Sequence, residues 1–265
     1  MATLLAGESR RKPRFPRRWL WAALGVALIA SAFLLDGPVE SYSRIETSPR
    51  LQQAAHLLSR AGEGWVIGVG GLVLSGVFWF RGRFNTARLI FLIGTVSLLT
   101  GLSATVMRSL VGRTRPHAEV PQGVYGVWHE SHWLIGQYQF GSFPSGHAAT
   151  VVGLAVAVWM ARRRLALVVA AYAALVSWSR VAQGCHHFSD IVAATVLAII
   201  WAPFLFRLLD PWTAWLAARL LTLSPVSAER QPSAMDSSPW GPHHETLRRV
   251  SAPEHSDIFD LSRAR

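Results

Sequence analysis

Residues 89–116 read LIFLIGTVSLLTGLSATVMRSLVGRTRP, and this stretch decides the fold. Residues 89–106 carry no charged side chain. A helix that crosses the hydrocarbon core of a bilayer needs about 20 mostly apolar residues, with a range of about 17–25. Arg108, Arg113 and Arg115 follow this run directly. The stretch therefore predicts a membrane-spanning helix that brings a group of arginines to one membrane surface.

Five similar apolar runs surround this one, in a chain that is 51% hydrophobic and only 15% charged. The six runs cover residues 19–35, 65–80, 89–106, 148–161, 165–178 and 191–206. The fourth and fifth are short for a span and need their polar flanks to complete it. Helices of a soluble bundle would carry a polar stripe, which these runs lack. We therefore predict an all-α fold, a six-helix transmembrane bundle.

The first run has a second interpretation as a signal peptide. A basic segment precedes it, and Ala30-Ser31-Ala32 resembles a cleavage site, so that residues 1–32 would be removed. However, the apolar residues continue through Leu35, and the run is long enough to span. We expect an uncleaved first helix.

The distribution of positive charge predicts the orientation. The net charge of +11 could indicate a nucleic-acid partner. However, 19 of the 26 Lys and Arg residues fall in segments that share a membrane side with the N-terminus. Cytoplasmic segments are enriched in Lys and Arg. We expect an integral plasma membrane protein of the bacterial inner membrane type, with both termini cytoplasmic and no nucleic-acid partner.

The chain divides into one membrane domain and its flanks. We predict a basic cytoplasmic N-terminus (1–18), a six-span membrane domain (19–208), a short interfacial helix (209–223) and a disordered cytoplasmic tail (224–265). The tail contains His243 and His244, which we interpret as solvated rather than metal-binding. Residues 51–60 have helical apolar spacing and predict a short helix at the outer surface.

Two further polar blocks stand at the ends of apolar runs. Pro144-Ser145-Gly146-His147 opens the fourth run. Ser179-Arg180, His186 and Asp190 connect the fifth and sixth runs. The predicted topology places these blocks and the first, Arg108 to Pro116, together on the outer face.

The residue types in these blocks suit a phosphate group. Guanidinium groups of Arg108, Arg115 and Arg180 can form bidentate hydrogen bonds to phosphate oxygens. A helix beginning near Ser145 and Gly146 presents a capping hydroxyl, free N–H groups and a partial positive charge, which favour a bound anion.

The third block adds a candidate nucleophile. His186 and Asp190 are four residues apart, which on a helix places both on one face. Asp190 can hold one imidazole nitrogen while the other attacks phosphorus, and His147 is then the general acid. His187 lacks this spacing and is expected at the surface or in support of the site. Cys185 is the single cysteine, which excludes an intrachain disulfide and a cysteine-based metal cluster.

Together the blocks resemble the signature of the type 2 phosphatidic acid phosphatase superfamily, K-x6-R-P, P-S-G-H and S-R-x5-H-x3-D. The resemblance covers the third to sixth runs, and Arg108 stands where the pattern has Lys. It implies that His186 forms a phosphohistidine, that Asp190 orients it, and that His147 protonates the leaving group and then activates water. It also implies phosphoryl stabilisation without metal or cofactor by Arg108, Arg115, Ser145, Gly146 and Arg180.

We accordingly expect a membrane phosphatase that hydrolyses a lipid phosphate or diphosphate at the outer face. Candidate substrates are undecaprenyl diphosphate, phosphatidic acid, phosphatidylglycerol phosphate and lipid A phosphate. A lipid-to-acceptor phosphotransferase and a non-catalytic lipid transporter or scramblase are the alternatives. Vanadium haloperoxidases share the resemblance, but the six apolar runs argue against such soluble proteins. The loop 117–142, with Trp128, His132, Trp133 and Tyr138, is expected to shape the lipid entrance.

Overall fold

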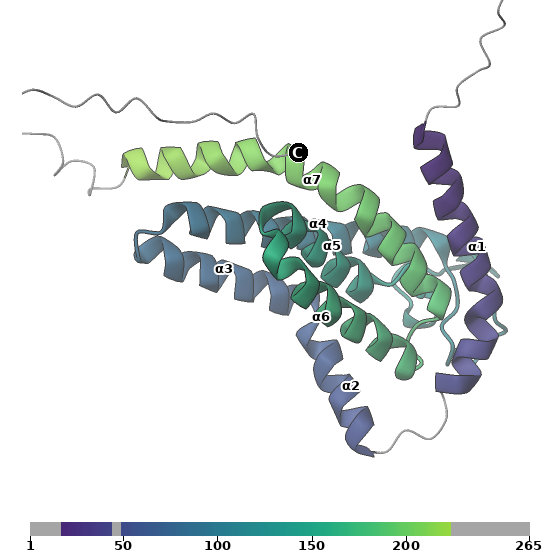
Figure 1. Cartoon of the computed structure of the whole chain (residues 1–265). Helices are drawn as coiled ribbons and strands as arrows, with labels where there is room; N and C mark the ends of the chain where they lie inside the picture. The colour runs from purple at the N-terminus through teal and green to yellow at the C-terminus, as the bar shows by residue number, and fades with distance from the viewer. Residues whose placement is uncertain (1–16, 44–48, 224–265) are drawn as a thin grey trace, which may run out of the picture. The chain divides into compact units, whose positions relative to one another are not determined.

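The computed structural model describes residues 17–43 and 49–223 as a predominantly helical chain (Figure 1). Its elements in chain order are α1 (Arg17–Ser43), α2 (Pro49–Ala61), α3 (Gly64–Phe80), α4 (Phe84–Val111), β1 (Trp128–His129), β2 (His132–Trp133), the 3₁₀ turn η1 (Tyr138–Phe140), α5 (Gly146–Ala161), α6 (Arg163–Ala182) and α7 (Phe188–Leu223). The predicted helical class is confirmed, and each of the six apolar runs lies within a helix.

The described helices include fewer candidate membrane spans than the six that the apolar runs predict. Within the described ranges, α1, α4, α6 and α7 are long and apolar enough to cross a bilayer. The pair α2 and α3 passes the same test as one span bent by 57°. The apolar helix α5 has only 16 residues. Length and composition therefore support four or five spans, and the predicted count of six is not reached by these criteria.

The last helix is longer than expected. A separate interfacial helix was predicted at residues 209–223, but α7 continues without a break through this segment. Pro203 and Pro211 lie inside α7, and proline is a common cause of helix bending. Figure 1 shows α7 changing direction along its length. The predicted N-terminal segment up to residue 16 and the tail 224–265 lie outside the described residues.

Close packing of α4 against α5 positions the site. A Cβ atom at Gly101 would lie 1.9 Å from Thr150 Oγ1, so only glycine allows this approach. Ser97 Oγ also donates to the carbonyl of Thr150 (2.8 Å). Small residues and interhelical hydrogen bonds are the usual means by which helices associate in a membrane. As a result, the end of α4 that carries Arg108 lies beside the start of α5.

The connection between α4 and α5 folds back over the end of α4. It contains a small hairpin in which Trp128 of β1 pairs with Trp133 of β2, an element that the sequence did not predict. Arg113 forms an isolated bridge with Val124. The backbone N–H of Ser142 donates to the carbonyl of Arg113 (3.0 Å). These contacts bring the residues after α4 next to the residues before α5.

Candidate active site

A glycine C-cap separates the arginines of the first block. Gly112 ends α4 with φ of 63°, in the left-handed region, and a Cβ there would lie 1.9 Å from the carbonyl oxygen of Gly126. Glycine is the residue that adopts this conformation without strain. Arg108 therefore stays on the last turn of α4, while Arg113 and Arg115 follow the cap in the connection.

The second block forms the N-terminus of α5. Ser145 is its N-cap, fully buried, and its Oγ accepts a long contact from the N–H of Ala148 (3.5 Å). The N–H of Ser145 donates to the carbonyl of Asp190 (3.2 Å). A Cβ built at Gly146 would lie 3.8 Å from Arg108 Nη1. The start of α5 is thus in contact with both the first and the third blocks.

His186 lies in the turn before α7 and is 1% exposed. Its Nδ1 is 2.9 Å from the carbonyl of Ser142 and 3.4 Å from Asp190 Oδ2. The helical spacing argument is wrong in one respect, because α7 begins at Phe188, after His186. Asp190 Oδ2 accepts from the N–H of His187 (2.8 Å) instead, so a capping turn brings the two side chains together.

The hydrogen bond to Ser142 fixes the protonation of the His186 ring. A carbonyl oxygen only accepts, so Nδ1 carries the proton, and the neutral ring keeps a lone pair on Nε2. Nε2 is buried and has no hydrogen-bond partner among residues 17–43 and 49–223. Burial lowers the pKa of His186 to about 4; the charges of Arg115 and Arg180 act in the same direction, and Asp190 opposes them. His186 is therefore neutral at neutral pH, with Nε2 free to attack.

Three arginines form a group beside His186, which we call the arginine cluster (Arg108, Arg115 and Arg180). The charges of Arg115 and Arg180 act on His186, and the charge of Arg108 acts on Arg115 and Arg180. Arg115 Nε donates to the carbonyl of Tyr138 (2.8 Å) and Nη1 to that of Cys185 (2.8 Å), while its guanidinium lies 3.9 Å from the centre of the Tyr138 ring. Within the described ranges, none of the three forms an ion pair with a carboxylate. Their positive charge is therefore uncompensated.

The other arginines of the cluster complete this picture. Arg180 Nη1 donates to the Ser59 hydroxyl, and its Nε is buried without a hydrogen-bond partner in the part of the chain that the structure describes. Arg108 is close enough to Arg180 for their charges to interact. Burial lowers the pKa of Arg115, and Arg108 and Arg180 add repulsion in the same direction. A bound anion would relieve this repulsion.

A pocket of about 150 Å³ opens beside the cluster. Its lining residues are Arg108, Ser109, Arg115, Leu134, Gly136, Gln137, Tyr138, Phe140 and Gly141. Tyr138 belongs to the loop 117–142, so this part of the loop does lie at the site. Trp128 and Trp133 are exposed, pack edge to face at 5.0 Å, and do not line the pocket.

The two other histidines in and beside the polar blocks, His147 and His187, differ in their surroundings. His147 is partly buried on the first turn of α5, and the charges of Arg108, Arg115, Arg180 and His186 all act on it, which places it among them. His187 is only 7% exposed, so the surface interpretation is wrong. Its Nε2 lies 3.2 Å from the carbonyl of Thr114 and its Nδ1 3.9 Å from Glu40, behind His186.

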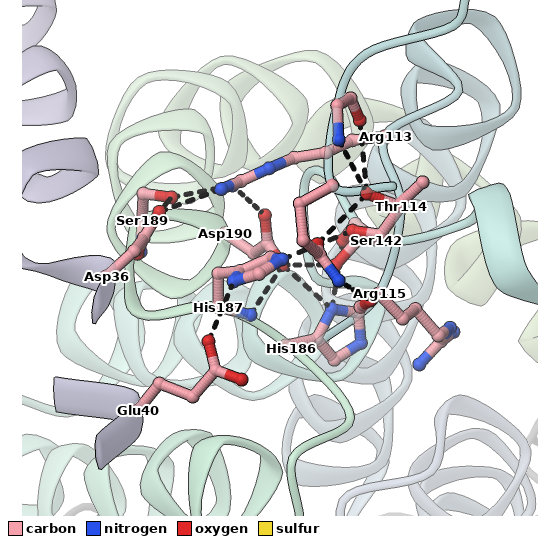
Figure 2. Close-up of polar contacts among 12 residues, drawn as sticks. Asp36, Glu40, Arg113, Thr114, Arg115, Ser142, His186, His187, Ser189 and Asp190 are labelled. Atoms are coloured by element: carbon pink, nitrogen blue, oxygen red, sulfur yellow. Dashed lines mark hydrogen bonds and ion pairs between the residues drawn. The ribbon is translucent and has the colours of Figure 1, made fainter. Parts of the chain in front are cut away.

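Sequence reasoning missed a second polar group behind His186, which we call the carboxylate network (Asp36, Arg113, Ser189 and Asp190). Figure 2 shows Arg113 reaching between Asp36 and Asp190. Asp36 comes from α1, so its contacts could not be read from local spacing. A carboxylate at the end of an apolar run is nonetheless a signal of function, and Asp36 directly follows the run 19–35 within α1.

Residues 17–43 and 49–223 contain no group of three or more His, Cys, Asp or Glu side chains that could hold a metal ion. The two tail histidines, His243 and His244, lie outside these ranges.

Comparison with known proteins identifies the family to which this chain belongs. A family model described as the PAP2 superfamily matches residues 86–214. A lipid A 1-phosphatase of Rhizobium etli is 30% identical over 237 residues, covering 77% of this chain and 95% of that protein. The chain belongs to the PAP2 superfamily. A lipid A 1-phosphatase of Rhizobium johnstonii is also 30% identical, over 67% of this chain and 75% of its own length.

Two solved PAP2 structures are similar at lower identity. A transmembrane PAP2 type phosphatidylglycerolphosphate phosphatase from Bacillus subtilis is 18% identical, covers 73% of this chain and 95% of its own, and has a TM-score of 0.44. Aquifex aeolicus LpxE is 19% identical, covers 65% and 95%, and has a TM-score of 0.46. The membership means that this PAP2 chain is an integral membrane lipid phosphatase. The roles of the individual site residues stay predictions.

Proposed function

We propose that this enzyme removes the phosphate at position 1 of lipid A, or of a closely similar glycolipid, through a phosphohistidine at His186. The two Rhizobium relatives support this choice, because one of them aligns over 95% of its length. Undecaprenyl diphosphate, phosphatidic acid and phosphatidylglycerol phosphate are then the competing substrates against which lipid A is measured.

In the first step, the Nε2 lone pair of His186 attacks phosphorus. The N–P bond forms while the bond from phosphorus to the lipid oxygen breaks, and His147 donates a proton to that oxygen. Arg108, Arg115 and Arg180 stabilise the negative charge on the transferring group. Such electrostatic stabilisation supplies most of the catalysis in phosphoryl transfer.

In the second step, water attacks the phosphohistidine. His147, now neutral, accepts the proton from water, the N–P bond breaks, and inorganic phosphate leaves. Asp190 orients the His186 ring through both steps and stabilises the positive charge that the ring carries as an intermediate. Ser145 and the N–H of Gly146 lie at the start of α5, whose partial positive charge favours the phosphate.

One observation carries this proposal: the unpartnered Nε2 of His186. A buried nitrogen with no hydrogen-bond partner is costly unless a ligand meets it. The same ring has its other nitrogen held in place and lies within the influence of Arg115 and Arg180. A nucleophile, its orienting group and an uncompensated cationic site thus occur together.

We also propose six membrane crossings, with α5 completing its span through its polar flanks. Both termini then lie in the cytoplasm, and the active site opens at the outer face. A reporter enzyme fused after Arg265 should be active only in the cytoplasm. A periplasmic signal would reverse the orientation and place the site on the inner face.

The direct test is phosphate release by the purified protein in detergent. Lipid A should be the best substrate of the panel, and lipid A that lacks the phosphate at position 1 should release none. His186→Ala should abolish release, while EDTA should have no effect. Equal rates of phosphate release from phosphatidic acid and lipid A would contradict the proposed substrate. A fully active His186→Ala variant would contradict the proposed mechanism.

A further inference from the structure

Arg113 is held more completely than any arginine of the cluster. Its Nη1 donates to Asp190 Oδ1 (2.6 Å) and to Ser189 Oγ (2.6 Å). Its Nη2 donates to Asp36 Oδ2 (2.7 Å). The guanidinium also lies 4.4 Å from the centre of the Phe33 ring, and Arg113 is 8% exposed. The positive charge of Arg113 is therefore compensated and its guanidinium is enclosed. It is not available to a phosphate, although it stands two residues from Arg115.

The contacts of Arg113 fix Asp190. One carboxylate oxygen of Asp190 accepts from Arg113, and the other accepts from Ser142 Oγ (2.5 Å) and from the N–H of His187 (2.8 Å). Asp190 is 0% exposed. With both oxygens held, the carboxylate has one orientation, in which Oδ2 lies 3.4 Å from His186 Nδ1. The orientation of the His186 ring thus depends on Arg113 indirectly, through Asp190.

Asp36 supplies the charge that this arrangement otherwise lacks. If Arg113 faced Asp190 alone, its positive charge would cancel the negative charge that His186 needs nearby. Asp36 binds the same guanidinium and also accepts from the N–H (2.8 Å) and hydroxyl (2.6 Å) of Ser189. Charges interact strongly in such a buried setting, where the effective dielectric is low. Two carboxylates on one guanidinium leave a net negative charge behind His186.

Figure 2 shows that Asp36 reaches this network from α1, while Ser189 and Asp190 come from the first turn of α7. A carboxylate within an apolar helix is expensive to keep unless it has a partner and a role. Both conditions are met here, since Asp36 has Arg113 and Ser189 as partners. The first helix, which lies outside all three polar blocks, therefore contributes to the site.

We propose that Asp36 and Arg113 are positioning residues for the phosphatase reaction. Arg113 holds the Asp190 carboxylate in the orientation that His186 requires, and Asp36 balances the charge of Arg113. This inference rests on the proposed role of His186 and Asp190. Neither positioning residue touches the substrate, so their loss should change turnover without changing substrate binding.

The test compares Asp36→Asn with wild type and with Asp210→Asn. The control breaks an ion pair of the same type, Arg88 Nη1 to Asp210 Oδ1 at 2.6 Å, which joins α4 to α7 away from the three blocks. Asp36→Asn should lower kcat by about 10- to 100-fold, the size of effect seen when a group that orients a metal-binding histidine is lost. KM should stay unchanged, and Asp210→Asn should keep the wild-type kcat.

The pH profile separates positioning from a general loss of structure. The charged and titratable groups that act on His186 are Asp190, Arg115, Arg180 and His147. Asp36→Asn leaves Arg113 more positive, so the acid limb of kcat should move to lower pH. If Asp36 had a merely structural role, Asp36→Asn would lower kcat by the same factor at every pH. The pH at which kcat falls on the acid side would then be unchanged. The substrate phosphate titrates near pH 6 in both proteins and cancels in the comparison.

Arg113→Lys is measured in parallel, because it keeps the buried positive charge but loses the guanidinium fork. It should also lower kcat with KM unchanged. If Asp36→Asn does not fold, Arg113→Lys alone tests the positioning role. Wild-type kcat in either folded variant overturns the inference. So does a raised KM with unchanged kcat, which would make Arg113 a phosphate ligand. If His186→Ala remains active, the proposed function fails instead.

Discussion

The carboxylate network and the arginine cluster meet at His186 but are built in opposite ways. In the network, Arg113 is paired with two carboxylates, and its donors end on charged or hydroxyl oxygens. In the cluster, Arg115 is equally buried, yet its donors end on the neutral carbonyls of Tyr138 and Cys185. The network is satisfied without a ligand, whereas the cluster keeps its charge for one.

This difference teaches that neighbouring arginines in one block can have unrelated tasks. Arg113 and Arg115 are separated by a single residue, and burial does not distinguish them, at 8% and 6% exposed. What distinguishes them is the charge of their acceptors. Substitutions in the carboxylate network should accordingly lower kcat alone, whereas substitutions in the arginine cluster should also raise KM.

Asp190→Asn should have the largest effect, since it removes the charge on which both the network and His186 depend. The amide cannot accept from Arg113, Ser142 and His187 as the carboxylate does. We expect kcat to fall by about 10³-fold or more, as when the carboxylate behind a catalytic histidine is lost. Steady-state phosphate release measures this; a loss below tenfold would show that Ser142 alone orients the ring.

Arg115→Ala should come next and should affect binding as well as turnover. The variant removes one charge of the cluster and leaves the carboxylate network intact. Loss of one stabilising donor costs about 10²- to 10³-fold in kcat, and KM should rise with it. Measuring both constants separates the two halves of the site. An Arg115 variant with wild-type KM would contradict its role as a phosphate ligand.

Arg108→Lys should have a small effect, within about fivefold, because the charge is kept while the fork is lost. The lysine would restore the residue found at this position in the family pattern. Arg108 lines the pocket beside Tyr138 and Gly141, so a smaller head group could also admit different substrates. The rates over the lipid panel measure this, and a loss as large as that of Arg115→Ala would show that the guanidinium geometry is essential.

The pH dependence should show the smallest change over the ordinary range. The pKa of His186 is lowered to about 4. Because the neutral ring is the nucleophile, its activity is full well above this value and is lost as the pH falls through about 4. A profile of kcat at saturating substrate should therefore show no His186 limb between pH 7 and 5. A fall in kcat near pH 6.5, the ordinary pKa of histidine, that moves when residues around His186 are substituted would contradict this. It would mean that the ring is solvated during turnover.

The sequence was sufficient for those parts of the site that depend on spacing along the chain. The motif residues Arg115, Ser145, Arg180, His186 and Asp190 are brought together in the structure. Apolar runs likewise located the helices, because each run is a local property. The predicted boundary between residues 208 and 209 is absent, because α7 continues through it to Leu223.

The carboxylate network could not be predicted in the same way. Asp36 and Arg113 are 77 residues apart, and Asp36 and Ser189 are 153 apart. Their contact depends on how α1 packs against the site, which no local pattern encodes. The position of His186 shows the same limit. Its spacing to Asp190 predicts that the two side chains meet, but the contact arises from a capping turn rather than a helix face.

The most direct test of the central claim is a rapid-quench experiment with a radiolabelled lipid phosphate, followed by peptide mapping. The claim is that His186 Nε2, held by the carboxylate network, takes the phosphoryl group. Label should appear on the peptide that contains His186 at early times and decay as free phosphate is released. His187→Ala should still be labelled, and His186→Ala should not. Label on another residue, or in His186→Ala, would contradict the account.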